Sequence, residues 1–233
     1  MCGIAGFTGE RMARERVLRA MTDSIRHRGP DGEGLYAGEG IALGMRRLAV
    51  IDPQGGTQPV WNETRTVATV YNGEIYNYPE LRAQLEQQGH LFATRCDTEV
   101  IVHLYEQYGA DFVSRLNGMF ALAVWDAPER TLLLARDHAG IKPLYYTIVD
   151  GQLWFASEIK ALLAAGVVRR ELNLRPLDAF FSHQYIAGEE SALRGVHRLM
   201  PGCQLRWCDG ESTVSRWWQL SYDVKPHYTA QGF

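Results

Sequence analysis

The sequence predicts an α+β fold in which two β-sheets pack against each other and helices cover their outer faces. Two near-continuous apolar runs, 119–125 and 131–135, are joined by the turn-forming segment 126–130, which predicts a buried hairpin. Strands that are apolar on both faces need cover on both sides, from a second sheet and from helices. Because the predicted strands gather in the middle of the chain with helices between them, sandwiched sheets with outer helices fit the pattern best.

The first part of the chain alternates between short strands and helices. Residues 2–7 are a short apolar segment with two glycines, which predicts a strand that another part of the molecule approaches closely. Apolar residues from Val17 to Ile25 recur at helical spacing, and the Gly- and Pro-containing segment 28–32 ends this helix. Further strands are predicted at 41–45, 47–51 and 66–70, and the dipeptide Asn72-Gly73 is typical of a turn.

The remaining elements follow from periodicity and from turn residues. Helices are predicted at 79–87, where a proline opens the helix, and around 100–108, where Gly109 ends it. Asp150-Gly151 is a strong hairpin signal between two apolar runs. The other predicted elements are the hairpin strands 144–149 and 152–156, helices at 158–165 and 176–181, and a last hairpin within 203–218. We expect one domain over 1–218, followed by a tail or linker over 219–233 that lacks hydrophobic periodicity.

Composition excludes several classes of function. With 22% charged residues, 46% hydrophobic residues and a formal net charge of −3, the 233-residue chain has no bias towards nucleic acid or a membrane surface. Because neither a bilayer-spanning apolar run nor a secretory signal pattern is present, we expect a cytoplasmic protein. The four cysteines have no paired CxxC spacing, and the seven histidines form no HExxH-type pattern, so we expect reduced thiols and no metal.

The chain begins Met1-Cys2-Gly3, which points to chemistry at residue 2. Removal of Met1 would leave a cysteine with both a thiol and a free α-amine. The α-amine, with a reference pKa of about 7.7–8.0, can take the thiol proton near neutral pH. Cys2 is therefore a candidate nucleophile with its own base. The alternative interpretation is a small apolar residue that opens a strand.

Six motifs, in order along the chain, resemble one enzyme family. They are MCGIAG (1–6), RHRGPDG (26–32), RRLAVID (46–52), YNGEIYNY (71–78), CDTEV (96–100) and RDHAGIKPLYY (136–146). Together they resemble the glutaminase half of asparagine synthetase, a class II glutamine amidotransferase of the N-terminal-nucleophile hydrolase type. ASEIKALL at 156–163 resembles the asparagine synthetase branch more than its relatives in sugar and purine pathways. The resemblance implies a four-layer αββα sandwich and the release of ammonia from glutamine.

The resemblance also implies roles for individual residues. Cys2 would attack the side-chain carboxamide of glutamine and form a γ-glutamyl thioester, with its α-amine moving the protons. Asn72 and Gly73 match the pair of donors that stabilises the oxyanion, a side-chain amide and a backbone N–H. A plain hairpin turn at Asn72-Gly73 is the alternative, and both could hold together.

A pocket for a free amino acid needs a fixed cation and fixed anions. Arg47 matches the clamp for the α-carboxylate, where a guanidinium makes two hydrogen bonds, and Asp97 and Glu74 match the partners of the α-ammonium. A helix N-cap is the alternative for Asp97. The pocket would also be lined by Leu48, Val50 and Ile51, for which an ordinary strand interior is the alternative.

The synthetase half of such an enzyme is not encoded in these residues, because no SGGxDS-type phosphate loop occurs. We expect the chain to be a truncated piece of a longer protein rather than a free-standing subunit. A synthetase domain in cis or in trans would use the ammonia, and ATP and magnesium are expected only there, so no cofactor is expected in this domain. The resemblance also allows a homodimer. The rival interpretations are a glutamine-binding or regulatory module without turnover, and an amidotransferase half whose partner amidates a peptide or sugar acid.

Overall fold

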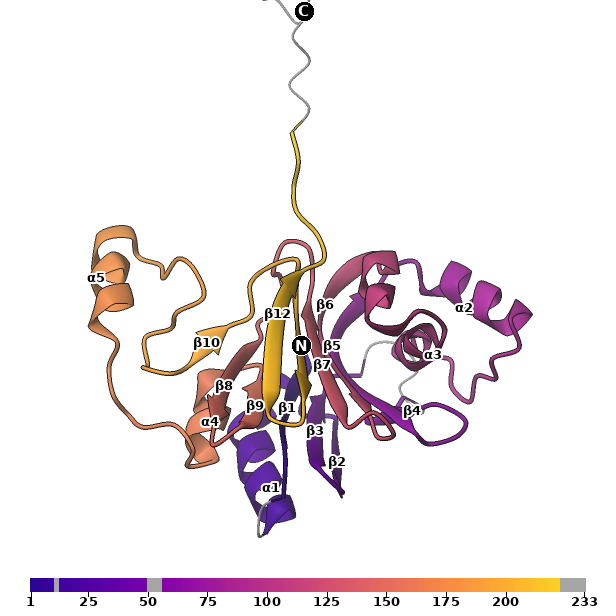
Figure 1. Cartoon of the computed structure of the whole chain (residues 1–233), viewed down its shortest axis with the longest axis horizontal. Helices are drawn as coiled ribbons and strands as arrows, with labels where there is room; N and C mark the ends of the chain where they lie inside the picture. Colours follow the sequence, from indigo (N-terminus) through magenta and orange to yellow (C-terminus); the bar gives the residue numbers. More distant parts are fainter. Residues whose placement is uncertain (11–12, 50–55, 223–233) are drawn as a thin grey trace, which may run out of the picture.

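Two antiparallel six-stranded sheets pack face to face and are covered by helices on their outer sides (Figure 1). The computed structural model describes residues 1–10, 13–49 and 56–222. The first sheet has the strand order β10-β8-β9-β1-β3-β2, and the second has the order β12-β11-β7-β6-β5-β4. The predicted α+β sandwich of four layers is therefore confirmed.

The strands of both sheets are mostly short. Those of the first sheet are β1 (Gly3–Thr8), β2 (Gly32–Gly38), β3 (Ile41–Arg47), β8 (Tyr145–Val149), β9 (Gln152–Ala156) and β10 (His197–Arg198). Those of the second sheet are β4 (Val60–Trp61), β5 (Val67–Ile75), β6 (Gly118–Asp126), β7 (Thr131–Arg136), β11 (Cys203–Cys208) and β12 (Glu211–Arg216).

The alternation of side chains along each strand explains the layers. On β6, Ala121 and Ala123 belong to the core between the two sheets, whereas Leu122 and Val124 belong to the core under the outer helices. Successive side chains of a strand point to opposite faces, so an all-apolar strand supplies two cores at once. This is why the two runs that predicted a buried hairpin form β6 and β7 in the middle of the sandwich.

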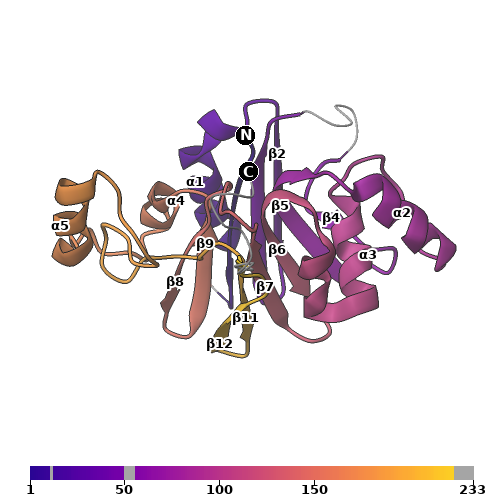
Figure 2. The same cartoon turned by 90° about the horizontal axis from the view of Figure 1, so that it is seen from above.

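Each sheet carries its own helices. Helices α1 (Arg14–Ser24) and α4 (Ile159–Ala164) cover the first sheet, and α2 (Tyr78–Gln87) and α3 (Glu99–Tyr108) cover the second (Figure 2). Two 3₁₀ segments, η1 (Arg26–Arg28) and η2 (Gly109–Arg115), follow α1 and α3. Helix α5 (Leu174–His183) lies away from both sheets (Figures 1 and 2). In the described part of the chain, no helix combines the length and the apolar character that crossing a membrane requires.

Two local predictions were wrong, and one strand was not predicted. Asn72 and Gly73 are not a turn, because β5 continues through them and pairs them with Ala121 and Phe120 of β6. Residues 33–38, to which the sequence analysis assigned no element, belong to the edge strand β2, whose backbone pairs along the whole of β3. The strand predicted at 47–51 ends at Arg47; Leu48 and Ala49 are outside any strand, and residues 50–51 lie outside the described residues. The domain boundary at 218 stays a prediction.

Candidate active site

One cavity of about 240 Å³ lies beside the N-terminus, and all predicted site residues that the structure describes line it. These are Cys2, Arg47, Leu48, Asn72, Gly73, Glu74 and Asp97. The other two predicted residues, Val50 and Ile51, lie outside the described residues. The cavity is where the start of β1, the end of β3 and the end of β5 meet: pairing of β1 with β3 brings residues 2 and 47 together, and packing of the second sheet against the first brings residue 72 to them.

Cys2 lies directly before β1 and beside the backbone that leaves β3. Pairing of Gly3 with Arg46 places the Cys2 sulfur next to Leu48, where Sγ is 3.4 Å from the Leu48 backbone nitrogen and 3.6 Å from its carbonyl oxygen. A Cβ added to Gly3 would come within 2.9 Å of Ile25 Cδ1. Glycine at position 3 therefore lets the chain pass close to this part of the structure and present Cys2 to the cavity.

The ion pair of Arg28 and Glu158 holds the backbone of Cys2 in place. Arg28 Nε donates a hydrogen bond to the Cys2 carbonyl oxygen at 2.9 Å, and Arg28 Nη1 donates to Glu158 Oε1 at 2.9 Å. Next to Glu158, the Ser157 backbone N–H donates to the Ile4 carbonyl oxygen at 2.9 Å. Sequence analysis missed this pair, although each member lies in a quoted motif, because 130 residues separate them. We interpret Arg28 and Glu158 as positioning residues.

Glu158→Gln is expected to destabilise the fold at neutral pH by about 1 kcal/mol, because water screens a side chain that is partly exposed. Burial raises the pKa of Glu158, but hydrogen bonds from Arg28, Lys160 and His27 outweigh this effect and lower the pKa to about 2. The unfolded value is near 4.5. A lowered folded pKa stabilises the fold above the unfolded pKa, and this stability is lost as pH falls from 4.5 towards 2.

The measurement is urea unfolding of wild type and Glu158→Gln at several pH values between about 6 and 3. The difference between the two proteins should narrow below the unfolded pKa. A matched control is Glu211→Gln on β12, where the glutamate is exposed. A difference that stays constant over this range would contradict the charge-based role.

The edge of β5 supplies a row of backbone donors to the cavity. In the described structure, β4 pairs with this edge of β5 at two positions, where Val60 lies opposite Thr69 and Trp61 lies opposite Ala68. Further along the same edge, the Tyr71 N–H donates to Gln58 Oε1 at 2.6 Å and the Ile75 N–H donates to Asp97 Oδ2 at 3.1 Å.

Alternate residues of a strand direct their N–H groups to the same edge. The Gly73 N–H, between those of Tyr71 and Ile75, therefore faces the cavity edge. A Cβ on Gly73 would lie 2.2 Å from the Met119 carbonyl oxygen, so this stretch of β5 requires glycine.

The Asn72 side chain is a second donor. It is 1% exposed, and its Nδ2 has no hydrogen-bond partner within the described part of the chain. Buried polar groups are almost always paired, so such a group in a cavity wall needs an explanation. A ligand oxygen that enters the cavity would supply the partner.

Two carboxylates give the cavity a negative side. Asp97 is 4% exposed, and its Oδ2 accepts hydrogen bonds from the Tyr71 hydroxyl at 3.0 Å and from the Ile75 N–H. The alternative interpretation of Asp97 as a helix cap was wrong, because Thr98 is the N-cap of α3 and the Asp97 carboxylate bonds to β5 instead. Burial and the Asp97 charge raise the pKa of Glu74, and Lys142 lowers it. A bound cation would relieve the repulsion between these two acids.

Sequence analysis missed other residues of the cavity wall. Lys142, which is 6% exposed, places its Nζ 3.5 Å from the Met1 sulfur, and Met1 itself lines the cavity. The remaining described lining residues are Met45, Gln58, Tyr71, Cys96, Thr98 and Met119. Lys142 lies in the quoted motif 136–146. Its presence in that motif is the signal that could have identified it as a second cation near the nucleophile.

The family described as "Glutamine amidotransferase domain" matches residues 1–218. The chain belongs to this family. This confirms the resemblance drawn from the six motifs. Asparagine synthetase (glutamine-hydrolyzing) 1 of Bacillus subtilis is 38% identical to this amidotransferase domain over 237 aligned residues, covering 99% of this chain and 37% of the relative. The maize asparagine synthetase (glutamine-hydrolyzing) is 46% identical over 166 residues, covering 70% of this chain and 28% of the relative.

The amidotransferase domain thus spans about a third of the length of the curated relatives it matches. Among solved structures, the glutamine phosphoribosylpyrophosphate amidotransferase of Bacillus subtilis superposes with a TM-score of 0.70 over 94% of this chain and 50% of that chain. At 22% sequence identity, that similarity shows the shared fold.

Proposed function

We propose that this amidotransferase domain hydrolyses L-glutamine to glutamate and ammonia through a γ-glutamyl thioester on Cys2. The observation that carries the proposal is that the Cys2 thiol lines the same cavity as the buried amide of Asn72, whose Nδ2 has no hydrogen-bond partner among the described residues. A nucleophile beside oxyanion donors is the arrangement that acyl transfer requires.

The steps follow from the groups in the cavity. The Cys2 sulfur bonds to the carboxamide carbon of glutamine, and the carbonyl oxygen becomes an oxyanion that Asn72 Nδ2 and the Gly73 N–H stabilise. The α-amine of Cys2 takes the thiol proton and passes it to the departing nitrogen, so the C–N bond breaks and ammonia leaves. Water then adds to the thioester carbonyl, the C–S bond breaks, and the sulfur regains its proton.

The charged groups suit the two ends of free glutamine. In this proposal Arg47 holds the α-carboxylate, while Asp97 and Glu74 hold the α-ammonium. The backbone and side chain of Leu48 form a wall next to the nucleophile, and the roles of Val50 and Ile51 rest on the sequence motif alone. The presence of both cations, Arg47 and Lys142, and anions, Glu74 and Asp97, in the cavity wall favours a zwitterionic amino acid over a simple amide.

The ammonia is proposed to pass to a synthetase domain, in cis or in trans, that amidates aspartate with ATP and magnesium. The support is that the curated relatives are asparagine synthetases of greater length than this chain. A cytoplasmic location is part of the proposal and is consistent with four free cysteines. The proposal has two variants. In the first, the protein forms a homodimer. In the second, the synthetase amidates another acceptor, and the acceptor specificity of the partner domain would decide this.

Removal of Met1 is the step that tests this function. In the structure Met1 precedes Cys2, so the Cys2 nitrogen is part of a peptide bond, and Met1 lines the cavity. Ammonia release from L-glutamine should therefore rise in proportion to the fraction of chains that lack Met1, as measured by intact-mass spectrometry. Treatment of unprocessed protein with a methionine aminopeptidase should restore activity. Equal turnover by processed and unprocessed chains would exclude the α-amine as the base.

A further inference from the structure

Two histidines and two glutamates from three segments converge on the outer side of the second sheet. Glu63 lies in the loop between β4 and β5, His90 follows α2, and His103 and Glu106 lie one turn apart on α3. Each offers one donor atom, and these four atoms all lie within 4.8 Å of one another. None of the four lines the cavity at Cys2.

The distances between these donor atoms fit the edges of a small coordination polyhedron. His103 Nδ1 is 3.2 Å from Glu106 Oε2 and 3.5 Å from Glu63 Oε2, and His90 Nδ1 is 3.6 Å from Glu106 Oε2. Zinc bonds of about 2.0–2.1 Å in tetrahedral geometry place neighbouring donor atoms about 3.4 Å apart. Three of the six donor-atom separations are therefore close to those of a tetrahedral zinc site, and all four donor atoms lie within 4.8 Å of one another.

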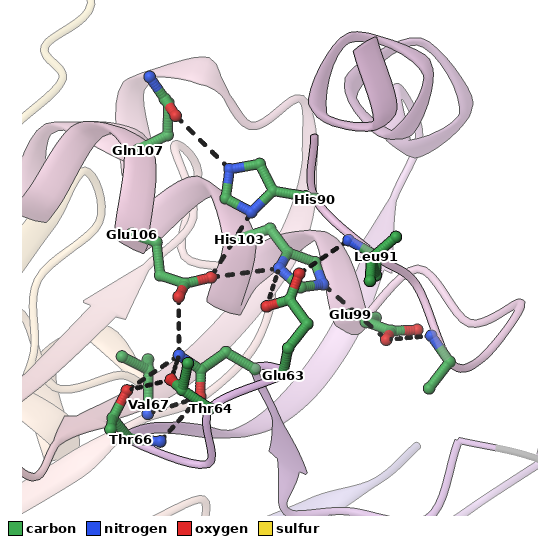
Figure 3. Close-up of polar contacts among 12 residues, drawn as sticks. Glu63, Thr64, Thr66, Val67, His90, Leu91, Glu99, His103, Glu106 and Gln107 are labelled. Atoms are coloured by element: carbon green, nitrogen blue, oxygen red, sulfur yellow. Dashed lines mark hydrogen bonds and ion pairs between the residues drawn. The ribbon is translucent and has the colours of Figure 1, made fainter. Parts of the chain in front are cut away.

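The outer oxygens of both carboxylates are held by the protein. Glu63 Oε1 accepts the Leu91 backbone N–H at 2.7 Å, and Glu106 Oε1 accepts Asn62 Nδ2 at 2.7 Å (Figure 3). Each glutamate thus keeps its second oxygen directed towards the histidines. Hydrogen bonds of this kind, which orient ligating groups, are a regular part of metal sites.

The outer nitrogens of both imidazoles also face acceptors. His90 Nε2 lies 3.5 Å from Gln107 Oε1, and His103 Nε2 lies 3.9 Å from Glu99 Oε1 (Figure 3). Glu99 is itself fixed, because its carboxylate accepts the backbone N–H groups of Ala93 and Thr94, both at 2.7 Å. A proton on each outer nitrogen leaves the Nδ1 lone pairs of His90 and His103 directed into the cluster.

Either a proton on His103 Nδ1 or a metal ion could satisfy the donor atoms that face the centre of the cluster. His103 is fully buried, and a His103 without a proton on Nδ1 would set the lone pair of that nitrogen against two carboxylate oxygens. A proton on Nδ1 of His103 would relieve that repulsion, but it would not use the Nδ1 of His90. A metal ion would use all four donors at once.

We propose that Glu63, His90, His103 and Glu106 bind one divalent transition-metal ion of the zinc type. Two imidazole nitrogens favour zinc and its first-row neighbours over magnesium and calcium, which prefer oxygen donors. The ion would join the β4–β5 loop, the segment after α2 and helix α3. Asp97 and Thr98, immediately before α3, line the Cys2 cavity, so the ion would also stabilise one wall of that cavity.

The test uses the full chain, freed of metal by a chelator and then titrated with zinc, cobalt, magnesium or calcium salts. We expect one zinc ion per chain, a rise in the unfolding temperature, and visible absorption bands of tetrahedral cobalt. Magnesium and calcium should produce none of these effects at the same concentrations.

Because His103 is buried and its replacement could unfold the protein, the decisive variants are His90→Gln and Glu63→Gln, whose side chains are 15% and 32% exposed. Each should weaken zinc binding about 10- to 100-fold or more. His183→Gln, at the exposed end of α5, and Glu211→Gln should bind zinc as wild type does. Absence of zinc binding in the wild type would overturn the proposal in favour of a protonated His103. Binding that both cluster variants leave unchanged would overturn it too, since the ion would then lie elsewhere. Neither result depends on glutamine turnover.

Discussion

Replacing Cys2 with alanine is expected to lower the rate of ammonia release from L-glutamine by about 10⁴-fold or more. Without the sulfur no thioester can form, and the oxyanion donors then have only direct attack by water to assist. The measurement is coupled detection of ammonia and glutamate with protein that lacks Met1. The matched control is Cys208→Ala, a cysteine on β11 that does not line the cavity, which should keep wild-type activity.

The Cys2→Ala protein should still bind glutamine, because Arg47, Glu74 and Asp97 are unchanged. Glutamine should therefore raise its unfolding temperature about as much as in the wild type. Ammonia release within a factor of ten of the wild-type rate would exclude Cys2 as the nucleophile.

Replacing Asn72 with alanine is expected to lower kcat about 10²- to 10³-fold while KM changes little. The Asn72 amide is buried and lacks a partner in the described structure. We therefore expect it to donate to the oxyanion, which exists only during the reaction. A group that acts only in the transition state changes kcat rather than KM. Steady-state kinetics over a range of glutamine concentrations measures both.

A matched control for this variant is Asn77→Ala, at the N-cap of α2 and outside the cavity. Its kcat should stay close to wild type, and thermal unfolding of both variants should show a folded protein. A rise in KM for Asn72→Ala with kcat unchanged would make Asn72 a ground-state binding group and contradict the oxyanion role.

The layered fold could be predicted because its strands are apolar on both faces. The runs that became β6 and β7 leave no polar face for water, so cover by a second sheet and by helices follows from burial alone. Asn72-Gly73 was wrongly predicted as a turn because that prediction used the two residues alone. Turn propensity is a local preference, and here pairing with β6 overrides it, while close approach to Met119 accounts for the glycine.

The site could be predicted only in part. Motifs identified the residues that line the cavity, but not the contacts that depend on distant pairing. Arg28 meets Glu158 across 130 residues because Ser157 follows β9, which lies beside β1. In the same way, the cluster of His90, His103 and the two glutamates has no sequence pattern, since its members come from a loop, a helix and a segment between helices. Such sets become visible only when the fold places them together.

The most direct measurement is covalent labelling of Cys2 by an electrophilic analogue of L-glutamine, followed by peptide mass spectrometry. Protein without Met1 should gain one analogue mass on Cys2, with excess L-glutamine slowing the reaction, while Cys96, Cys203 and Cys208 stay unmodified. If Cys2 remains unlabelled in processed protein, or if another cysteine reacts instead, the account of a thioester at the N-terminal residue is wrong.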